Sequence, residues 1–215
     1  MSEPEHYFSA RPEVASAPRT VRLTVDGLSL DLATDAGVFS ADHIDLGTKV
    51  LLGSAPEPTV RGDLLDLGCG YGPIALTLAH RRKRARVWAV DVNERALELT
   101  RRNAEAAGRG NIRACLPDEV PPEVRFAAIY SNPPIKVGKS ILHTMLRHWV
   151  GRLLPGGTAY LVVQKHLGSD SLARWLTDQG FPTTRLTSER GYRVLAVQPT
   201  PSAGDDPCTN SAAPS

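Results

Sequence analysis

The sequence predicts an α/β fold: a doubly wound, mostly parallel sheet of seven strands that closes with an antiparallel hairpin and is preceded by a small N-terminal β-hairpin. Three observations support it. From residue 64 onward, short apolar strands alternate with amphipathic helices, which is typical of βαβ units. The last two strands follow one another without a helix between them, which indicates an antiparallel pair. Asp26-Gly27 separates two runs of alternating polar and apolar residues, a strong hairpin signal.

The individual elements follow from apolar spacing and from the residues at their ends. Strands are expected at residues 20–25, 28–33, 64–67, 86–90, 112–116, 126–131, 158–164, 183–187 and 192–198. Helices are expected at residues 41–53, 73–80, 94–107, 140–154 and 169–179. Pro73 suits a first helical turn because its missing N–H would have no partner there. Gly108, Gly180 and the run Pro155-Gly156-Gly157 are expected to end helices.

Composition limits the class of protein. The chain has 215 residues, of which 41% are hydrophobic and 22% charged, with a net charge of +2. These values suit a globular protein and exclude a collagen-like or wholly disordered chain and one that binds nucleic acid by overall charge. We expect a loose arm at residues 1–19, one domain at residues 20–198 and a disordered, apolar-poor tail at residues 199–215.

Cysteine usage and hydropathy indicate a cytoplasmic protein. The three cysteines, Cys69, Cys115 and Cys208, are odd in number and have no metal-ligand spacing, so reduced thiols and no metal site are expected. The N-terminus lacks an apolar signal-peptide core, and no apolar run approaches the roughly 18 residues of a membrane helix. The oligomeric state is left open.

A glycine-rich turn follows the first strand of the alternating region. It reads Asp66-Leu67-Gly68-Cys69-Gly70-Tyr71-Gly72. Glycines at alternate positions let the backbone approach a ligand closely, but the dinucleotide fingerprint needs a glycine where Pro73 stands. The carboxylate of Asp66 favours a cationic or amine-bearing ligand over a pyrophosphate. Asp91 ends the next strand, where an acid binds ribose hydroxyls in nucleoside-binding sheets.

These motifs resemble those of the class I methyltransferase family over residues 62–198. The resemblance implies a Rossmann-like methyltransferase fold with S-adenosylmethionine as its cofactor. It places the cofactor against Asp66, Gly68, Cys69, Gly70, Gly72, Asp91, Val92, Thr48 and Asn132. The family commonly has an Asp contact to adenine after the third strand, where this chain has Leu116. Asp118 is the other candidate, and the two remain open.

A second motif follows the fourth expected strand of the alternating region and reads Asn132-Pro133-Pro134-Ile135. Ligands of open α/β sheets bind beyond the carboxyl ends of the strands, so Asn132 should face the glycine-rich turn. The Asn132 side-chain oxygen and the Pro133 carbonyl suit the two hydrogens of an exocyclic amine. Accepting both would draw the planar nitrogen toward tetrahedral geometry, and in-line attack on a sulfonium methyl would need no strong base. Positioning would supply most of the acceleration.

The run from Asn132 to Lys139 and the upstream stretch that begins at Gly37 resemble the ribosomal RNA small-subunit guanine-N2 methyltransferase branch, in its single-domain form. The resemblance implies a catalytic role for Asn132-Pro133-Pro134-Ile135 and substrate contacts from Phe39, Lys136 and Lys139. It makes ribosomal RNA or a ribosomal subunit the expected partner. The same chemistry on adenine N6, on a protein glutamine or on a small natural product stays open, as does a cofactor-binding, RNA-associated protein without activity.

Basic residues gather away from these motifs. Residues 80–113 hold ten Lys and Arg against four acids. Within it, the cluster Arg-Arg-Lys-Arg-Ala-Arg at residues 81–86 should lie at the amino edge of the sheet, opposite the predicted site. Two interpretations remain: a solvated helix end, or a secondary patch that docks phosphates.

Overall fold

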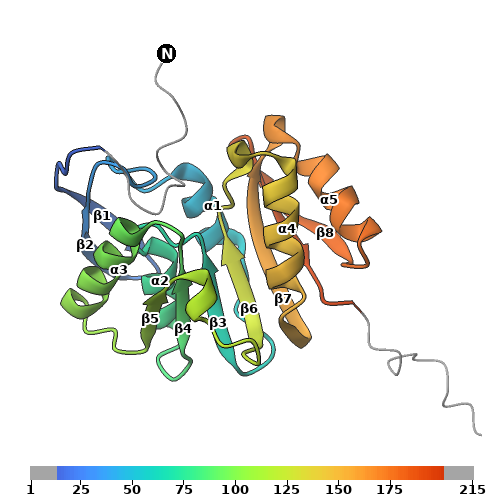
Figure 1. The fold of residues 1–215 in the computed structure, drawn as a ribbon, viewed down its shortest axis with the longest axis horizontal. Helices are drawn as coiled ribbons and strands as arrows, with labels where there is room; N and C mark the ends of the chain where they lie inside the picture. The colour runs from blue at the N-terminus through green and yellow to red at the C-terminus, as the bar shows by residue number, and fades with distance from the viewer. Residues whose placement is uncertain (1–13, 201–215) are drawn as a thin grey trace, which may run out of the picture.

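The computed structural model describes residues 14–200, so residues 201–215 of the predicted tail and residues 1–13 of the predicted arm lie outside them. Its seven-stranded sheet has the order β5-β4-β3-β6-β7-β9-β8, beside a separate two-stranded sheet β1-β2. In the seven-stranded sheet β9 is antiparallel to both β7 and β8, and the other pairs are parallel; β1 and β2 are antiparallel. The predicted fold class is thereby confirmed (Figure 1).

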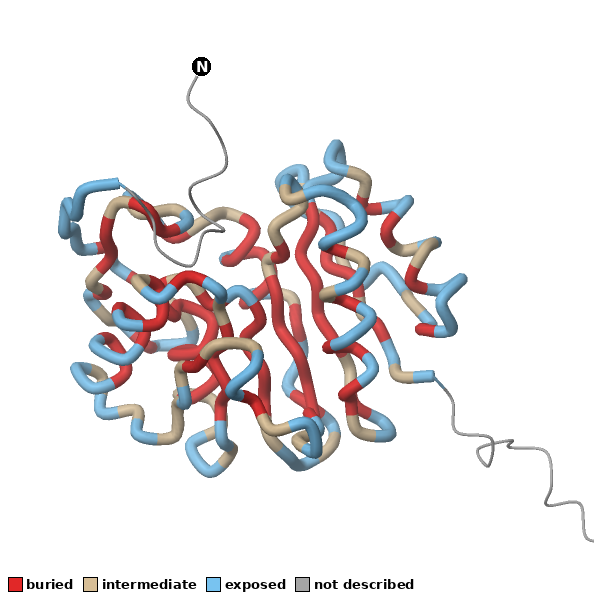
Figure 2. The backbone as a smooth tube through the Cα atoms, in the orientation of Figure 1, coloured by how far each residue is buried: buried red, intermediate tan, exposed pale blue. Residues whose placement is uncertain are grey.

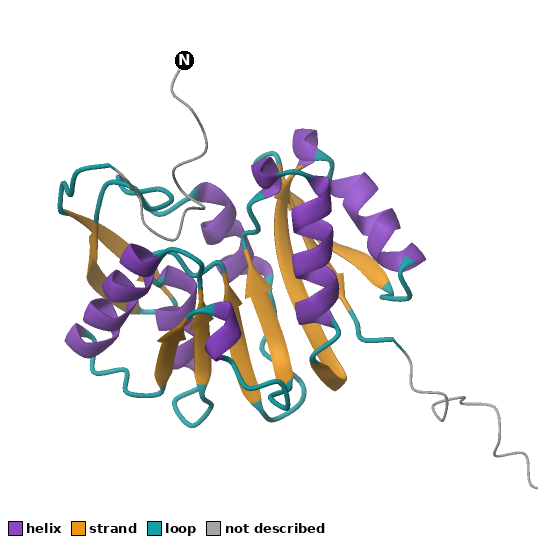
Figure 3. Ribbon diagram, viewed as in Figure 1, coloured by secondary structure: helices purple, strands orange, loops and turns teal. Residues whose placement is uncertain are grey.

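The elements alternate along the chain as expected (Figure 3). The strands are β1 (Arg19–Val25), β2 (Leu28–Thr34), β3 (Asp63–Leu67), β4 (Val87–Val90), β5 (Ile112–Cys115), β6 (Phe126–Ser131), β7 (Leu153–Gln164), β8 (Thr183–Glu189) and β9 (Tyr192–Val197). The α-helices are α1 (Leu46–Ser54), α2 (Pro73–Arg81), α3 (Glu94–Ala106), α4 (Lys139–Val150) and α5 (Ser169–Asp178). Short 3₁₀ helices include η2 (Pro117–Glu119), η3 (Ile135–Val137) and η4 (Lys165–Leu167). None of the helices in the described part of the chain has the length and apolarity to cross a membrane.

Side chains on alternate positions of each central strand supply two different cores. On one face Leu65 and Ile129 pack with Leu146 of α4 and Leu176 of α5. On the other face Leu64, together with residues of α1, α2 and α3, forms a second core. The central strands are therefore buried on both sides (Figure 2). A third core joins the β1-β2 hairpin to α2 and α3, which fixes the hairpin beside the end of the sheet.

The first helix begins later than predicted. We expected a helix over residues 41–53, but α1 spans Leu46–Ser54. The preceding chain turns at Ser40, whose φ is +55°, and the Asp45 carboxylate accepts a hydrogen bond from the Thr48 N–H at 3.0 Å. Asp45 is therefore the N-cap, a position that Asp strongly favours, and the apolar residue Ile44 lies before the helix.

The Pro155-Gly156-Gly157 run lies inside a strand, so its prediction as a helix end was wrong. α4 ends at Val150 and β7 already begins at Leu153. The pairing of β6 with β7 shifts register here, since Phe126 pairs with Leu153 while Ala128 pairs with Thr158. The extra residues form a bulge, where a proline is tolerated because no ladder hydrogen bond is required of it.

Gly157 in this bulge should tolerate no larger residue. A Cβ there would lie 2.9–3.1 Å from the carbonyl oxygens of Leu154, Ala127 and Phe126. We expect Gly157→Ala to lower the free energy of unfolding by about 1–3 kcal/mol, because backbone must move to admit it. Gly53→Ala in α1 is the matched control, since nothing lies within 4 Å of its Cβ position, and it should be stabilising. Equal effects in urea denaturation would contradict the packing argument.

Candidate active site at the carboxyl edge of the sheet

The two predicted motifs lie side by side because β3 and β6 are neighbours in the sheet. Leu67 at the end of β3 pairs with Ser131 at the end of β6, and the buried Ser131 hydroxyl donates a hydrogen bond to the Leu67 carbonyl at 2.7 Å. The next residues along the two strands are Gly68 and Asn132. The glycine-rich turn and the Asn-Pro-Pro motif therefore meet at the carboxyl edge, at the upper ends of these strands in Figure 1.

The glycine-rich turn leaves open space above its first half. Gly68 and Gly70 have φ values of +76° and +56°, and no atom lies within 4 Å of the Cβ that either would carry. The Gly70 N–H donates to the Asp91 carboxylate at 2.9 Å, so the ends of β3 and β4 are joined across this space. The turn is thus a cradle that a side chain would fill, and its shape fits a bound ligand.

The second half of the turn has a packing role. Gly72 has a φ of +94°, and its Cβ would meet the Thr100 side chain at 3.0–3.4 Å. The buried Cys69 thiol also lies toward the Thr100 hydroxyl, at 3.7 Å, so only the Cys69 backbone is available to a ligand at the open side. Thr100 also donates to the Gly70 carbonyl at 2.8 Å. Sequence reasoning missed Thr100, because an isolated helical threonine gives no signal of its own.

Two acids lie beneath the cradle. Asp66 is fully buried, and its Oδ2 atom accepts a hydrogen bond from the Ala75 N–H at 2.9 Å, while its Oδ1 atom has no partner among the described residues. Burial raises the pKa of Asp66 to about 8, with a smaller contribution from the charge of Asp91. Burial also raises the pKa of Asp91. A positively charged ligand beside these buried carboxyl groups would stabilise their ionised form.

Substitution of Asp66 should change how stability depends on pH. The native pKa of about 8 lies above the ordinary Asp value of about 3.9. Between these values the native state keeps a proton that the unfolded state has lost, so wild-type stability falls as pH rises. Asp66→Asn cannot titrate at this position, so its melting temperature relative to wild type should rise from pH 5 and level off near pH 8 in ligand-free protein. A pH-independent difference would contradict the raised pKa.

The Asn132 side chain is held in one orientation. Its Nδ2 atom donates hydrogen bonds to the Asp45 carboxylate at 2.8 Å and to the Thr48 hydroxyl at 3.2 Å. A carboxylate can only accept, so the amide nitrogen must face α1 and the amide oxygen faces away from it. Thr48, predicted as a cofactor contact, is thus a direct partner of Asn132. Sequence reasoning gave Asp45 no role, although an Asp directly before a helix is an N-cap signal.

The two prolines shape the backbone after Asn132. Pro133 is buried and its carbonyl accepts a hydrogen bond from the Ile135 N–H at 2.9 Å. A carbonyl oxygen has two lone pairs, so Pro133 keeps a second acceptor position. Ile135 packs against the core beneath α4, which anchors η3. The motif therefore presents the Asn132 oxygen and the Pro133 carbonyl from a fixed turn.

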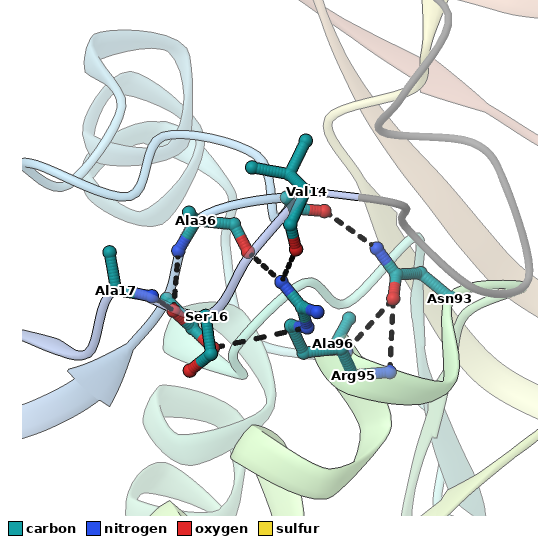
Figure 4. Close-up of polar contacts among 9 residues, drawn as sticks. Val14, Ser16, Ala17, Ala36, Asn93, Arg95 and Ala96 are labelled. Carbon is teal, nitrogen blue, oxygen red and sulfur yellow. Dashed lines mark hydrogen bonds and ion pairs between the residues drawn. The ribbon is translucent and has the colours of Figure 1, made fainter.

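The segment before α1 is tied to the site through a polar network (Figure 4). Asn93 donates to the Gly37 carbonyl at 2.9 Å, and Arg95 donates to the Ala36 carbonyl at 2.6 Å and to the Val14 carbonyl at 3.0 Å. The Asp35 carboxylate accepts from Ser16, Ala17 and Ala36. Part of the predicted arm is therefore in contact with the domain. Phe39 follows this network with 49% of its surface exposed.

The remaining predicted residues are less constrained. Val92, Lys136 and Lys139 are exposed. Leu116 is half-buried and its N–H donates to Glu119 at 2.8 Å, while Asp118 is exposed in η2. The free thiols of Cys69 and Cys115 are buried, and Cys208 lies outside the described residues. Across residues 14–200, no group of three or more His, Cys, Asp or Glu side chains could hold a metal ion.

The sheet order, the open glycine cradle and the Asn-Pro-Pro motif define a class I methyltransferase domain that uses S-adenosylmethionine. The chain belongs to the methyltransferase small domain family, whose model matches residues 29–196. The chain is 36% identical to the uncharacterized protein YbxB of Bacillus subtilis (strain 168) over 197 residues, which are 90% of this chain and 98% of that protein.

Two further relatives act on ribosomal RNA by their names. Ribosomal RNA small subunit methyltransferase C of Hahella chejuensis (strain KCTC 2396) is 41% identical over 146 residues, 65% of this chain and 42% of that protein. A T. thermophilus 16S rRNA N2 G methyltransferase (RsmC), solved with AdoMet and guanosine, has a TM-score of 0.74 at 28% identity. The match covers 87% of this chain and 52% of that one. The chain therefore spans about half the length of these two relatives.

Proposed function

We propose that this protein transfers the methyl group of S-adenosylmethionine to guanine N2 of ribosomal RNA. The observation that carries the proposal is the orientation of Asn132, whose amide nitrogen is held by Asp45 and Thr48. This leaves the Asn132 oxygen free to accept a hydrogen bond beside the glycine cradle. An exocyclic amine requires such an acceptor for one of its hydrogens.

The residues present fit the cofactor. S-adenosylmethionine carries an electrophilic methyl on a positively charged sulfur. S-adenosylmethionine would lie against the backbone of Gly68 and Gly70, in the space that a side chain at either position would occupy. Asp91 would hold its ribose hydroxyls, and a cationic ligand would favour the ionised form of the buried Asp66 carboxyl, whose Oδ1 atom has no partner among the described residues. Val92 and the Cys69 backbone border the same space by their positions in the chain.

The chemistry then depends on hydrogen-bond acceptance. The Asn132 oxygen accepts one amine hydrogen and the Pro133 carbonyl accepts the other, which returns lone-pair density to the nitrogen. The two N–H bonds on Asp45 and Thr48 polarise the Asn132 amide and strengthen its oxygen as an acceptor. Fixed acceptors of this kind need no reorganisation during the reaction. Phe39 would stack on the base, and Lys136 and Lys139 would bind phosphates of the target nucleotide.

The choice of acceptor rests on the relatives and on charge. Two relatives are named for ribosomal RNA, and one was solved with guanosine. Exposed lysines follow Ile135, at 136 and 139. The same chemistry on adenine N6, a protein glutamine or a small molecule is the competing proposal.

The test is methyl transfer from labelled S-adenosylmethionine to three acceptors: isolated small subunits, isolated large subunits and deproteinised ribosomal RNA. The label should enter RNA and appear as N2-methylguanosine after digestion to nucleosides. The Asn132→Ala variant is the control for contaminating activity. Label found in protein or a small metabolite alone would overturn the proposal.

A further inference from the structure

The open edge of the sheet carries acidic side chains at one half and basic side chains at the other. Over β3 and β4 it carries Asp66 and Asp91, neither of which has an ion pair with a cation of the described residues. Over β6 and β7 it carries lysines instead. We define the cationic rim as Lys136, Lys139 and Lys165, three exposed side chains in η3, α4 and η4.

The three lysines lie on adjoining turns. Lys136 and Lys139 follow β6, and Lys165 follows β7, which is the neighbour of β6 in the sheet. The Lys165 N–H donates to the Gly191 carbonyl at 2.8 Å, which brings the β8-β9 turn to the same edge. Figure 2 shows this edge as exposed where α4 and η4 begin. The rim therefore extends away from Asn132, on the side opposite the cofactor cradle.

The rim lysines are free to bind an anion. None of them forms an ion pair with a carboxylate among residues 14–200, while the acids nearby are already engaged: Asp170 with Arg193, and Glu189 with Arg190 at 3.3 Å. The pKa of His143 on α4 is lowered by burial and, to a smaller extent, by the charges of Lys139 and Arg147. The surface therefore has a positive charge that the domain itself does not neutralise.

The ten basic residues of segment 80–113 offer a useful contrast. Seven of them have partners within the described fold: Arg81, Arg82, Arg86, Arg95 and Arg101 form ion pairs, Arg109 contacts His80, and Arg113 lies over the Trp88 ring. The other three, Lys83, Arg84 and Arg102, have none there and form what we call the far-edge cluster. They belong to the α2–β4 loop and to α3, at the edge opposite Asn132.

We infer that the cationic rim is the surface that holds the RNA chain next to the target nucleotide, through its phosphates. The inference rests on the proposed function for the identity of the polyanion. A base that reaches Asn132 brings its neighbouring phosphates to the same edge. The rim lies at the half of the edge away from Asp66 and Asp91, and its positive charge attracts these phosphates. The far-edge cluster has equal charge but lies too far around the fold to share in this contact.

Two matched triple variants test the inference. The rim variant is Lys136→Glu/Lys139→Glu/Lys165→Glu, and the far-edge variant is Lys83→Glu/Arg84→Glu/Arg102→Glu. Both variants change the net charge by the same amount, at opposite edges of the sheet. The probe is deproteinised small-subunit ribosomal RNA, bound at several salt concentrations. The rim variant should bind at least tenfold more weakly, and the slope of log affinity against log salt should fall by about two, since each lost phosphate contact removes about 0.7–0.9. The far-edge variant should stay within about threefold of wild type.

The outcomes separate the surface from the proposed function. Affinity for S-adenosylmethionine, measured by calorimetry, reports whether each variant is folded, and a Lys→Gln triple at the rim replaces the first variant if it is not. The role of the rim in RNA binding would be overturned by any of three results: equal losses of RNA affinity in both triple variants, a larger loss in the far-edge variant, or no RNA affinity in wild type. If the rim controls RNA binding but wild type transfers no methyl to RNA, the surface stands and the proposed function fails. If the rim variant binds RNA normally and wild type methylates RNA, the role of the rim in RNA binding is refuted and the proposed function stands.

Discussion

Asn132→Ala should reduce the turnover number by on the order of a hundredfold or more, the usual loss when one fixed transition-state hydrogen bond is removed. The affinity for S-adenosylmethionine should change only a few-fold, because the glycine cradle and Asp91 do not depend on this side chain. Single-turnover methyl transfer and calorimetry measure the two quantities separately. Turnover at the wild-type level would exclude the acceptor role of Asn132.

Asp45 provides a sharper form of the same prediction. Asp45→Asn keeps an N-cap for α1 but replaces an obligate acceptor with an amide, so Asn132 is free to rotate its oxygen toward α1. Turnover should fall by about tenfold or more, since a misplaced acceptor is costly, while the melting temperature stays close to that of wild type. Asp42→Asn is the matched control, because Asp42 is exposed and pairs with Arg19. Equal losses in the two variants would contradict the positioning role.

The second large effect is expected at Gly70. Gly70→Arg should abolish measurable binding of S-adenosylmethionine in calorimetry, because the new side chain would enter the space that is open above the turn. It would also place a positive charge where a cationic ligand is expected. The φ of +56° at Gly70 adds strain to any substitution, so Gly70→Ala measures that part alone.

Gly110→Arg is the control for this experiment. Gly110 is exposed, has no atom within 4 Å of its Cβ position and lies in the loop between α3 and β5, away from the cradle. The affinity of the Gly110→Arg variant for S-adenosylmethionine should match that of wild type. If Gly70→Arg also binds with wild-type affinity while its fold is retained, the cofactor does not lie against this turn.

The regular alternation of strands and helices was predictable because each βαβ unit repeats the same local signals. The fold class followed from this alternation, and so did the glycine-rich turn and the Asn-Pro-Pro turn, each directly after a strand. The start of α1 was not predictable from apolar spacing, because Ile44 is buried yet lies before the helix. A buried residue in a loop and one in a helix look alike in a sequence.

The missing parts of the site share one cause: they are contacts between segments far apart in the chain. Asp45 and Asn132 are separated by 87 positions, and Thr100 meets the Gly70 carbonyl across 30 positions. The bulge at Gly157 was misread for a related reason. A Pro-Gly-Gly run ends a helix in local terms, and only the pairing of β7 with β6 shows that it continues a strand.

The short turn between β4 and α3 serves two parts of the protein at once. Asp91 holds the Gly70 N–H, and two residues later Asn93 holds the Gly37 carbonyl. A ligand bound on Asp91 and the folded state of the segment before Phe39 are therefore thermodynamically linked. Cofactor binding should slow hydrogen exchange at the amides of Ala17 and Ala36, which donate to Asp35 in that segment. Loosening that segment should in turn weaken cofactor affinity by the same factor, so the segment before Phe39 should be ordered most firmly when S-adenosylmethionine is bound.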